Sequence, residues 1–364
     1  MKAATMMTIQ PTANTSVSGT RPAPSSDVML SVKGLWKVFG ATPEEFARAN
    51  GPSLSDAEIA AKGWMAAVKD ASFEIRKGEI FVIMGLSGSG KSTLIRSLTR
   101  LNEPTAGQLL IEQQDVTRAS HETLISLRRK TLGMVFQNFA LLPNRTVASN
   151  IAFPLEIQGV PEAEYRQRAR ELMDLVGLRG REDHYPSELS GGQQQRVGIA
   201  RSLATEPHIW VLDEPFSALD PLIRTDLQDE VLRLQSSLHK TVIFITHDLD
   251  EAIKLADRIA IMEHGRIVQI GTPQELIASP ANDYVKRFVS RVPLAKVTKV
   301  QQVMTALNGP EVIGGTTIRP DSSIESIAAL AIQAEGALPV HDGERLVGKL
   351  ERERVLRVLA GLRD

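Results

Sequence analysis

Residues 81–97 read FVIMGLSGSGKSTLIRS, an apolar run followed by a loop of glycine and serine and then by a lysine and two hydroxyls. The stretch contains the pattern G-x-x-x-x-G-K-[ST], which begins at Gly85 and ends with Gly90, Lys91 and Ser92. The apolar run predicts a strand and the residues after it predict a helix, which is the context that a phosphate-binding loop requires. Glycine keeps Cβ atoms out of the loop, so backbone N–H groups can surround phosphate oxygens at the start of the helix.

The loop also predicts what its side chains do. Lys91 is expected to reach the terminal phosphates of a nucleotide, and the Ser92 hydroxyl is expected to ligate Mg²⁺. The alternative is a glycine-rich linker that merely joins strand to helix, but the strand, the spacing and the lysine together favour phosphate binding. The nucleotide-binding candidates in the loop are Gly85, Ser87, Gly88, Ser89, Gly90, Lys91, Ser92 and Thr93.

Two kinds of segment alternate along the chain from about Met29 to Ile270. Apolar runs such as IFVIMG, IWVLDE and TVIFIT are separated by charged stretches with helical periodicity. This alternation predicts an α/β fold in which helices cover a sheet. At 364 residues, the chain is long enough for more than one domain.

Composition excludes several classes of function. The chain has no cysteine, which removes disulfides, thiolate metal sites and cysteine nucleophiles and fits a reducing compartment. Its 42 basic and 43 acidic residues give no overall electrostatic reason to expect a nucleic-acid partner. Residues 1–28 begin with a stretch rich in Thr, Ser, Ala and Pro that lacks the apolar core of a secretory signal, and they predict a flexible tail. The longest apolar runs fall far short of the roughly 20 residues that span a bilayer, so any membrane role is expected to be peripheral.

A second motif, HIWVLDEPFSALD at residues 208–220, places two carboxylates at the end of an apolar run. A buried strand that ends in Asp213 and Glu214 puts both side chains at the carboxyl edge of the sheet, where ligands of open α/β sheets bind. Asp213 is expected to hold Mg²⁺, and Glu214 is expected to act as the general base toward the attacking water. Taken alone, the pattern also fits a strand that runs into a solvated turn.

A third motif, ELSGGQQQRVGIARSLA at residues 188–204, predicts a helix with one apolar face and small residues at its start. Such a start can bind an anion, although a lone Ser190 would more often be a simple helix cap. Here LSGGQ lies between a phosphate loop and LDEP, and this combination resembles the ATP-binding cassette (ABC) family, whose signature sequence is LSGGQ. The resemblance extends from about Leu30 to Val289.

This resemblance implies further roles in ATP binding and hydrolysis. Phe39 would stack on adenine, with Trp36 as the alternative. Gln137 would approach Mg²⁺ and the attacking water, and His247 would contact the γ-phosphate as the switch histidine. Imidazole can donate a hydrogen bond to a phosphate at neutral pH, which agrees with the last assignment.

The resemblance also implies a dimer. In the family, ATP binds between the phosphate loop of one cassette and the signature helix of another, and this chain carries one copy of each motif. A homodimer that holds two ATP molecules is therefore expected, with a symmetric interface. The partner's ATP would contact Ser190, Gly191, Gly192 and Gln193, and the loop at Asp220 would cross to the other subunit.

Within the family, the sequence resembles the ATPase subunits of importers for quaternary amines, the glycine betaine, choline and proline group. Its partners would be an integral membrane permease and an extracytoplasmic substrate-binding protein, and it would lie at the cytoplasmic face of the cell (inner) membrane. The apolar segment 138–147, which includes FALLP, is expected to touch the permease.

Three alternatives to this assignment remain open. An importer for another amino acid such as histidine is one. A soluble ABC ATPase that acts on nucleic acid or the ribosome is a second, although such proteins usually carry two cassettes or a long coiled-coil insertion. A plain phosphate-loop kinase is a third, against which the LSGGQ signature argues.

The expected domain organisation has three parts. Residues 1–28 form the tail, and residues 29–290 form the ABC ATPase domain, with a helical insertion at 41–66 and a helical signature subdomain at about 138–205. Residues 291–364 form a linker and a small α+β domain with the order strand, helix, strand, turn, strand, helix. This part resembles a single cystathionine-β-synthase-type (CBS) unit, which would either sense adenine nucleotide or ionic strength or serve only in dimerisation.

Overall fold

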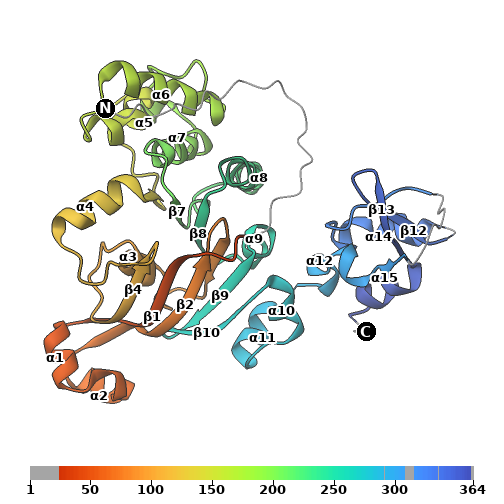
Figure 1. The fold of residues 1–364 in the computed structure, drawn as a ribbon, viewed down its shortest axis with the longest axis horizontal. Coiled ribbons are helices and arrows are strands. Elements are labelled where there is room, and N and C mark those ends of the chain that lie inside the picture. Colours follow the sequence, from red (N-terminus) through yellow and green to blue (C-terminus); the bar gives the residue numbers. More distant parts are fainter. Residues whose placement is uncertain (1–23, 291, 308–314, 335, 362–364) are drawn as a thin grey trace.

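The computed structural model describes residues 24–290, 292–307, 315–334 and 336–361 (Figure 1). Most of the predicted N-terminal tail lies outside these residues. No helix in the described part of the chain is both long enough and apolar enough to cross a membrane.

A six-stranded sheet lies at the centre of the cassette, in the order β10-β9-β3-β8-β7-β6. All neighbours pair in parallel except β10, which is antiparallel to β9. β3, β7 and β8 are buried along their whole length, which explains their continuous apolar sequences. The strands are β3 Ile80–Met84, β6 Leu132–Val135, β7 Ile209–Asp213, β8 Thr241–Thr246, β9 Arg258–Glu263 and β10 Arg266–Gly271.

A second, antiparallel sheet covers one face of the first, in the order β2-β1-β4-β5. Its strands are β1 Val28–Phe39, β2 Met65–Arg76, β4 Ala106–Ile111 and β5 Gln114–Asp115. The rings of Phe73 and Phe81 stack at 5.2 Å and join the two sheets. The sequence predicts helices over a sheet, but on this face strands form much of the cover.

Helices complete both faces of the central sheet. α3 Lys91–Leu98 and α4 His121–Lys130 lie on the side of the antiparallel sheet. The opposite face packs against α5 Val147–Glu156, α6 Glu162–Leu175, α7 Gly191–Leu203, α8 Pro221–Leu238, α9 Leu249–Leu255, α10 Pro273–Ala278 and α11 Asp283–Val289. Between β1 and β2, the chain forms α1 Pro43–Arg48, the 3₁₀ helix η1 Gly51–Ser53 and α2 Asp56–Ala61. Another 3₁₀ helix, η2 Pro186–Glu188, precedes α7.

The C-terminal part has a hydrophobic core of its own. Its elements are α12 Leu294–Val297, α13 Val300–Val303, β11 Thr305–Ala306, α14 Ile324–Gln333, β12 Leu338–Asp342, β13 Arg345–Leu350 and α15 Arg352–Leu359. The strands form a sheet in the order β11-β13-β12, and Ile318 makes a parallel bridge to Val340. The predicted order of strand, helix, strand, strand and helix matches the described elements. The first strand is present only as the bridge of Ile318 to Val340.

Candidate functional site

The phosphate loop joins β3 to α3 and needs two of its glycines for space and for backbone conformation. Gly85 has φ +157°, and a Cβ there would lie 2.4 Å from the Met262 carbonyl oxygen. Gly90 has φ +101°, and its Cβ would lie 2.2 Å from the Ala67 carbonyl oxygen. Any other residue at these positions would clash with fixed backbone, so the loop's shape depends on glycine.

Lys91 begins α3 and is almost completely buried. Its Nζ donates hydrogen bonds to the carbonyl oxygens of Gly85 at 2.8 Å and Leu86 at 3.0 Å, so the side chain curls back over the loop. Burial lowers the pKa of the Lys91 ammonium, while the charges of Glu214 and Asp213 oppose that shift. Lys91, Asp213 and Glu214 are therefore close enough for the two carboxylate charges to stabilise the ammonium.

Asp213 ends β7 with its side chain in the interior. Burial raises the pKa of its carboxyl, and the neighbouring Glu214 charge raises it further, against Arg96 and Lys91. Its Oδ1 is buried with no hydrogen-bond partner among the described residues, and the Ser89 Oγ in the phosphate loop is in the same condition. Orphaned buried oxygens beside a phosphate loop fit a hard cation that accepts carboxylate and hydroxyl ligands.

The described residues contain no cluster of three or more acidic or histidine side chains that could cage a metal. Mg²⁺ is usually held by one or two carboxylates together with the substrate's phosphates rather than by an all-protein cage. Ser92, Asp213 and Gln137 are the residues that would hold it. The ion would supply positive charge against the phosphate oxygens.

Glu214 and His247 meet at the carboxyl edge of the central sheet. His247 Nδ1 lies 3.1 Å from Glu214 Oε2. Asp213 and Ile245 pair in the neighbouring strands β7 and β8, and this pairing brings Glu214 close to His247. The Glu214 backbone N–H adds a hydrogen bond to the Ile245 carbonyl oxygen at 3.1 Å. The imidazole is 59% exposed and the Glu214 side chain 17%, so His247 is the solvent-exposed member of the pair.

The predicted Gln137 is exposed two residues after the end of β6, the strand that neighbours β7. It therefore follows the same carboxyl edge as Asp213. The two aromatic candidates differ in burial, because Trp36 is 3% exposed and packs on Phe46, whereas Phe39 is 39% exposed. Phe39 ends β1 opposite Met65 of β2, the strand whose Ala67 approaches the phosphate loop, and the Lys37 ammonium lies 5.1 Å from the centroid of its ring.

The signature residues begin α7, where Ser190 is the helix cap and forms a capping box with Gln193. A Cβ at Gly192 would lie 2.6 Å from Ile223, so this glycine also permits α7 to pack closely on α8. α7 packs on α5, α6, α8 and β6, whereas α3 packs on β1 and β2. Figure 1 shows α3 and α7 in well-separated parts of the cassette.

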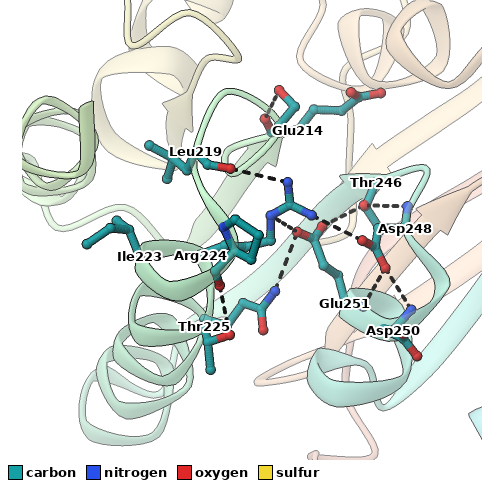
Figure 2. Close-up of polar contacts among 12 residues, drawn as sticks. Glu214, Leu219, Ile223, Arg224, Thr225, Thr246, Asp248, Asp250 and Glu251 are labelled. Atoms are coloured by element: carbon teal, nitrogen blue, oxygen red, sulfur yellow. Dashed lines mark hydrogen bonds and ion pairs between the residues drawn. The ribbon is translucent and has the colours of Figure 1, made fainter. Parts of the chain in front are cut away.

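Asp220 caps α8 by accepting a hydrogen bond from the Ile223 backbone N–H at 3.1 Å. Four residues later, Arg224 joins a polar network with Asp248 and Glu251 that the sequence analysis missed (Figure 2). The only sequence signals for it were an arginine in the first turn after SALD and the acidic residues that follow His247.

The apolar segment 138–147, predicted to touch the permease, is only partly turned outward, since Asn138, Ala140, Pro143 and Asn144 are exposed. Phe139 and Leu141 are half-buried and pack against the core of the helical layer. Arg201 fixes the turn by donating to the carbonyl oxygens of Phe139 at 3.0 Å and Ala140 at 2.7 Å. The chain's own packing therefore accounts for much of the apolar character from which a permease contact was predicted.

These features define an ATP-binding cassette, and comparison with known proteins gives the same result. The ABC transporter family profile matches residues 68–217. The ATP-binding protein TmoW of the trimethylamine N-oxide transport system from Ruegeria pomeroyi is 48% identical, over 91% of this chain and 97% of that protein. The chain belongs to the ABC transporter family, as one of its ATP-hydrolysing subunits.

Related proteins serve several transport systems. The ATP-binding protein ProV of the glycine betaine/proline betaine transport system from Escherichia coli is 50% identical, over 76% of this chain and 69% of that protein. A solved dimeric ATP-binding cassette in a post-hydrolysis state, bound to ADP and phosphate, is 31% identical, with a TM-score of 0.57 over 67% of this chain and 99% of that one.

Proposed function

We propose that this chain powers ATP-driven import of a small methylated amine, of the trimethylamine N-oxide and betaine class. The supporting observation is the extent of the similarity, which reaches 97% of the length of the trimethylamine N-oxide relative but only 69% of the glycine betaine/proline betaine relative. A chain that matches the first relative from end to end is the better candidate for the same class of substrate.

The proposed residue roles follow from the carboxyl edge of the central sheet. Lys91 and the backbone of residues 85–93 bind the phosphates, while Ser92, Asp213 and Gln137 serve Mg²⁺. Glu214 is the general base, and His247, 3.1 Å from it, contacts the terminal phosphate. Phe39 stacks on the adenine ring.

The proposed assembly is a homodimer on a membrane permease. The separate positions of α3 and α7 support it, because α7 packs on α5, α6, α8 and β6, whereas α3 packs on β1 and β2. Ser190, Gly191, Gly192 and Gln193 would contact the ATP of the other subunit, near Asp220. The dimer would lie at the cytoplasmic face of the membrane, and an extracytoplasmic binding protein would deliver the amine.

We further propose that residues 29–290 form the ATPase domain and that residues 291–364 form a CBS-like domain that regulates it or dimerises. The Lys296 ammonium lies 2.5 Å from the Asp250 carboxylate, in the first turn of α9. α9 starts two residues after His247, so this contact reaches the segment that carries the switch histidine.

Transport in reconstituted vesicles tests the proposed function. The chain, its permease and its binding protein would be placed in proteoliposomes loaded with ATP, and uptake of labelled trimethylamine N-oxide, glycine betaine, choline and histidine compared. We expect ATP-dependent uptake of a methylated amine and none of histidine. Uptake of histidine alone would overturn the substrate class, and co-purification with nucleic acid in place of a permease would overturn the transporter assignment.

A further inference from the structure

Arg224 occupies a position that connects two loops of the catalytic edge. It lies in the first turn of α8, and its guanidinium faces three acceptors (Figure 2). Nη2 donates to the Leu219 carbonyl oxygen at 3.3 Å, Nη1 donates to Asp248 Oδ2 at 3.3 Å, and Nε lies 3.7 Å from Glu251 Oε1. A planar arginine fork can hold several acceptors in fixed directions at once.

The acceptors belong to both sides of the site. Leu219 lies in the loop between Glu214 and α8. Asp248 directly follows His247 and caps α9, where its Oδ1 accepts from the backbone N–H groups of Asp250 at 2.9 Å and Glu251 at 3.2 Å. One cation therefore connects the loop after the proposed base to the loop of the proposed switch histidine.

A second link reaches the residue before the histidine. Thr246 donates from Oγ1 to Glu251 Oε2 at 2.6 Å and accepts from the Asp248 backbone N–H at 2.9 Å. Glu251 is 6% exposed, and burial raises the pKa of its carboxyl, which the Arg224 charge opposes. Through Glu251 and Asp248, Arg224 thus holds the chain on both sides of His247.

Arg224 also lies beside Glu214 and His247, the proposed reacting groups, but forms no hydrogen bond or ion pair with either of them. A small cavity at the catalytic edge is lined by Glu214, Ser217, Arg224, Thr246, His247, Asp248 and Glu251. Arg224 lines this cavity together with Glu214 and His247. A displacement of the guanidinium would therefore alter the space in which those two groups meet.

We propose that Arg224 is a positioning residue for ATP hydrolysis, which ties the loop 215–220 to the His247 loop and holds the imidazole against Glu214. The inference rests on the proposed roles of Glu214 and His247. Since Asp220 is proposed to face the other subunit, Arg224 would also couple closure of the dimer to the position of His247. It acts through these residues.

The test compares three variants of the full-length chain, with kcat, KM and nucleotide affinity measured separately. A misplaced catalytic group can cost about 100-fold in rate, so Arg224→Ala is expected to lower kcat by roughly 30- to 100-fold, with KM and ATP affinity within about twofold. Arg224→Lys keeps the charge but not the fork and should fall between Arg224→Ala and wild type. Arg233→Ala is the control on the same helix, because Arg233 is 55% exposed and donates to the Leu175 carbonyl, away from the site.

Non-additivity distinguishes positioning from a general structural role. If Arg224 acts through His247, then adding Arg224→Ala to His247→Ala should lower kcat by less than about threefold more, because coupled residues are not additive. Full multiplication of the two effects would overturn the inference, as would a wild-type kcat for Arg224→Ala. An unimpaired His247→Ala alone would instead contradict the proposed role of the histidine.

A second variant keeps the inference testable if Arg224→Ala does not fold. Asp248→Asn removes the charge that Arg224 contacts and retains a side chain that caps helices equally well. We expect kcat to fall about tenfold with an unchanged melting temperature, since a lost charge-assisted hydrogen bond costs of this order. An unchanged kcat in Asp248→Asn would overturn the link between Arg224 and the histidine loop.

Discussion

His247 Nδ1 lies 3.1 Å from Glu214 Oε2, although 33 residues separate them in the chain. The contact follows from the sheet, because β7 and β8 are parallel neighbours that end at the same edge. A base placed beside an exposed imidazole can be held in one orientation while the histidine remains accessible to a phosphate. Hydrolysis and the state of the switch loop are therefore expected to depend on each other.

Glu214→Gln tests this arrangement together with the dimer. The change removes the proton acceptor and keeps the shape, so ATP should still bind while hydrolysis falls by at least about 100-fold. Since the proposed dimer opens only after the γ-phosphate contacts are lost, the variant should accumulate as an ATP-dependent dimer in light scattering. The wild-type chain should stay mostly monomeric under the same conditions.

The matched control adds Ser190→Arg to the same chain. Ser190 is an exposed helix cap, and an arginine there would place bulk and charge where the other subunit's ATP is proposed to bind. The double variant should bind ATP and remain monomeric. Rapid hydrolysis by Glu214→Gln would exclude the proposed base, and a trapped dimer that survives Ser190→Arg would exclude the shared site.

Arg196 is expected to matter for stability rather than for chemistry. It lies in α7, pairs with the buried Glu230 of α8 and donates to the Val176 carbonyl oxygen at 2.8 Å. Arg196→Ala would leave the buried Glu230 with only the longer contact to Arg233, at 3.9 Å, so it should lower the free energy of unfolding by about 3 kcal/mol. Arg166→Ala is the control, because its pair with Glu162 is exposed and should contribute about 0.5 kcal/mol or less. Equal effects in urea unfolding would contradict this difference.

Glu230 also predicts a dependence of stability on pH. Burial raises the pKa of its carboxyl above the ordinary value of 4.5, so the folded chain keeps this proton to higher pH than the unfolded chain does. The free energy of unfolding contributed by Glu230 is therefore largest below pH 4.5 and falls as pH rises toward the raised pKa. Glu230→Gln lacks this proton, so its stability relative to wild type should increase with pH over that interval. Denaturant titrations across the interval measure it, and a constant or decreasing difference would contradict the prediction.

The strands β3, β7 and β8 were well predicted from the sequence, because their apolar runs are long and uninterrupted, and the roles of the residues that follow them stay predictions. The sequence did not predict the antiparallel sheet, since β1 and β2 are separated by the helical insertion and only their pairing shows that they are neighbours. Arg224 was missed for a similar reason, because Asp248 and Glu251 meet it only where α9 packs on α8. The half-buried Phe139 shows a further limit, as an apolar loop residue does not reveal whether it faces the core or a partner.

The ion pair between Lys296 and Asp250 gives the C-terminal part a salt-dependent contact with the cassette. Asp250 is 70% exposed and Lys296 33%, so the pair should contribute about 0.5 kcal/mol and be screened by salt. If this contact transmits regulation, then Lys296→Glu in the assembled transporter at low salt should show the ATPase rate that wild type shows at high salt. Exchanging the two charges in Lys296→Glu with Asp250→Lys should restore the wild-type salt response. The measurement is the ATPase rate as a function of salt concentration. Identical curves for wild type, the single variant and the exchanged pair would contradict a regulatory role of this contact and favour a role of the C-terminal part in dimerisation alone.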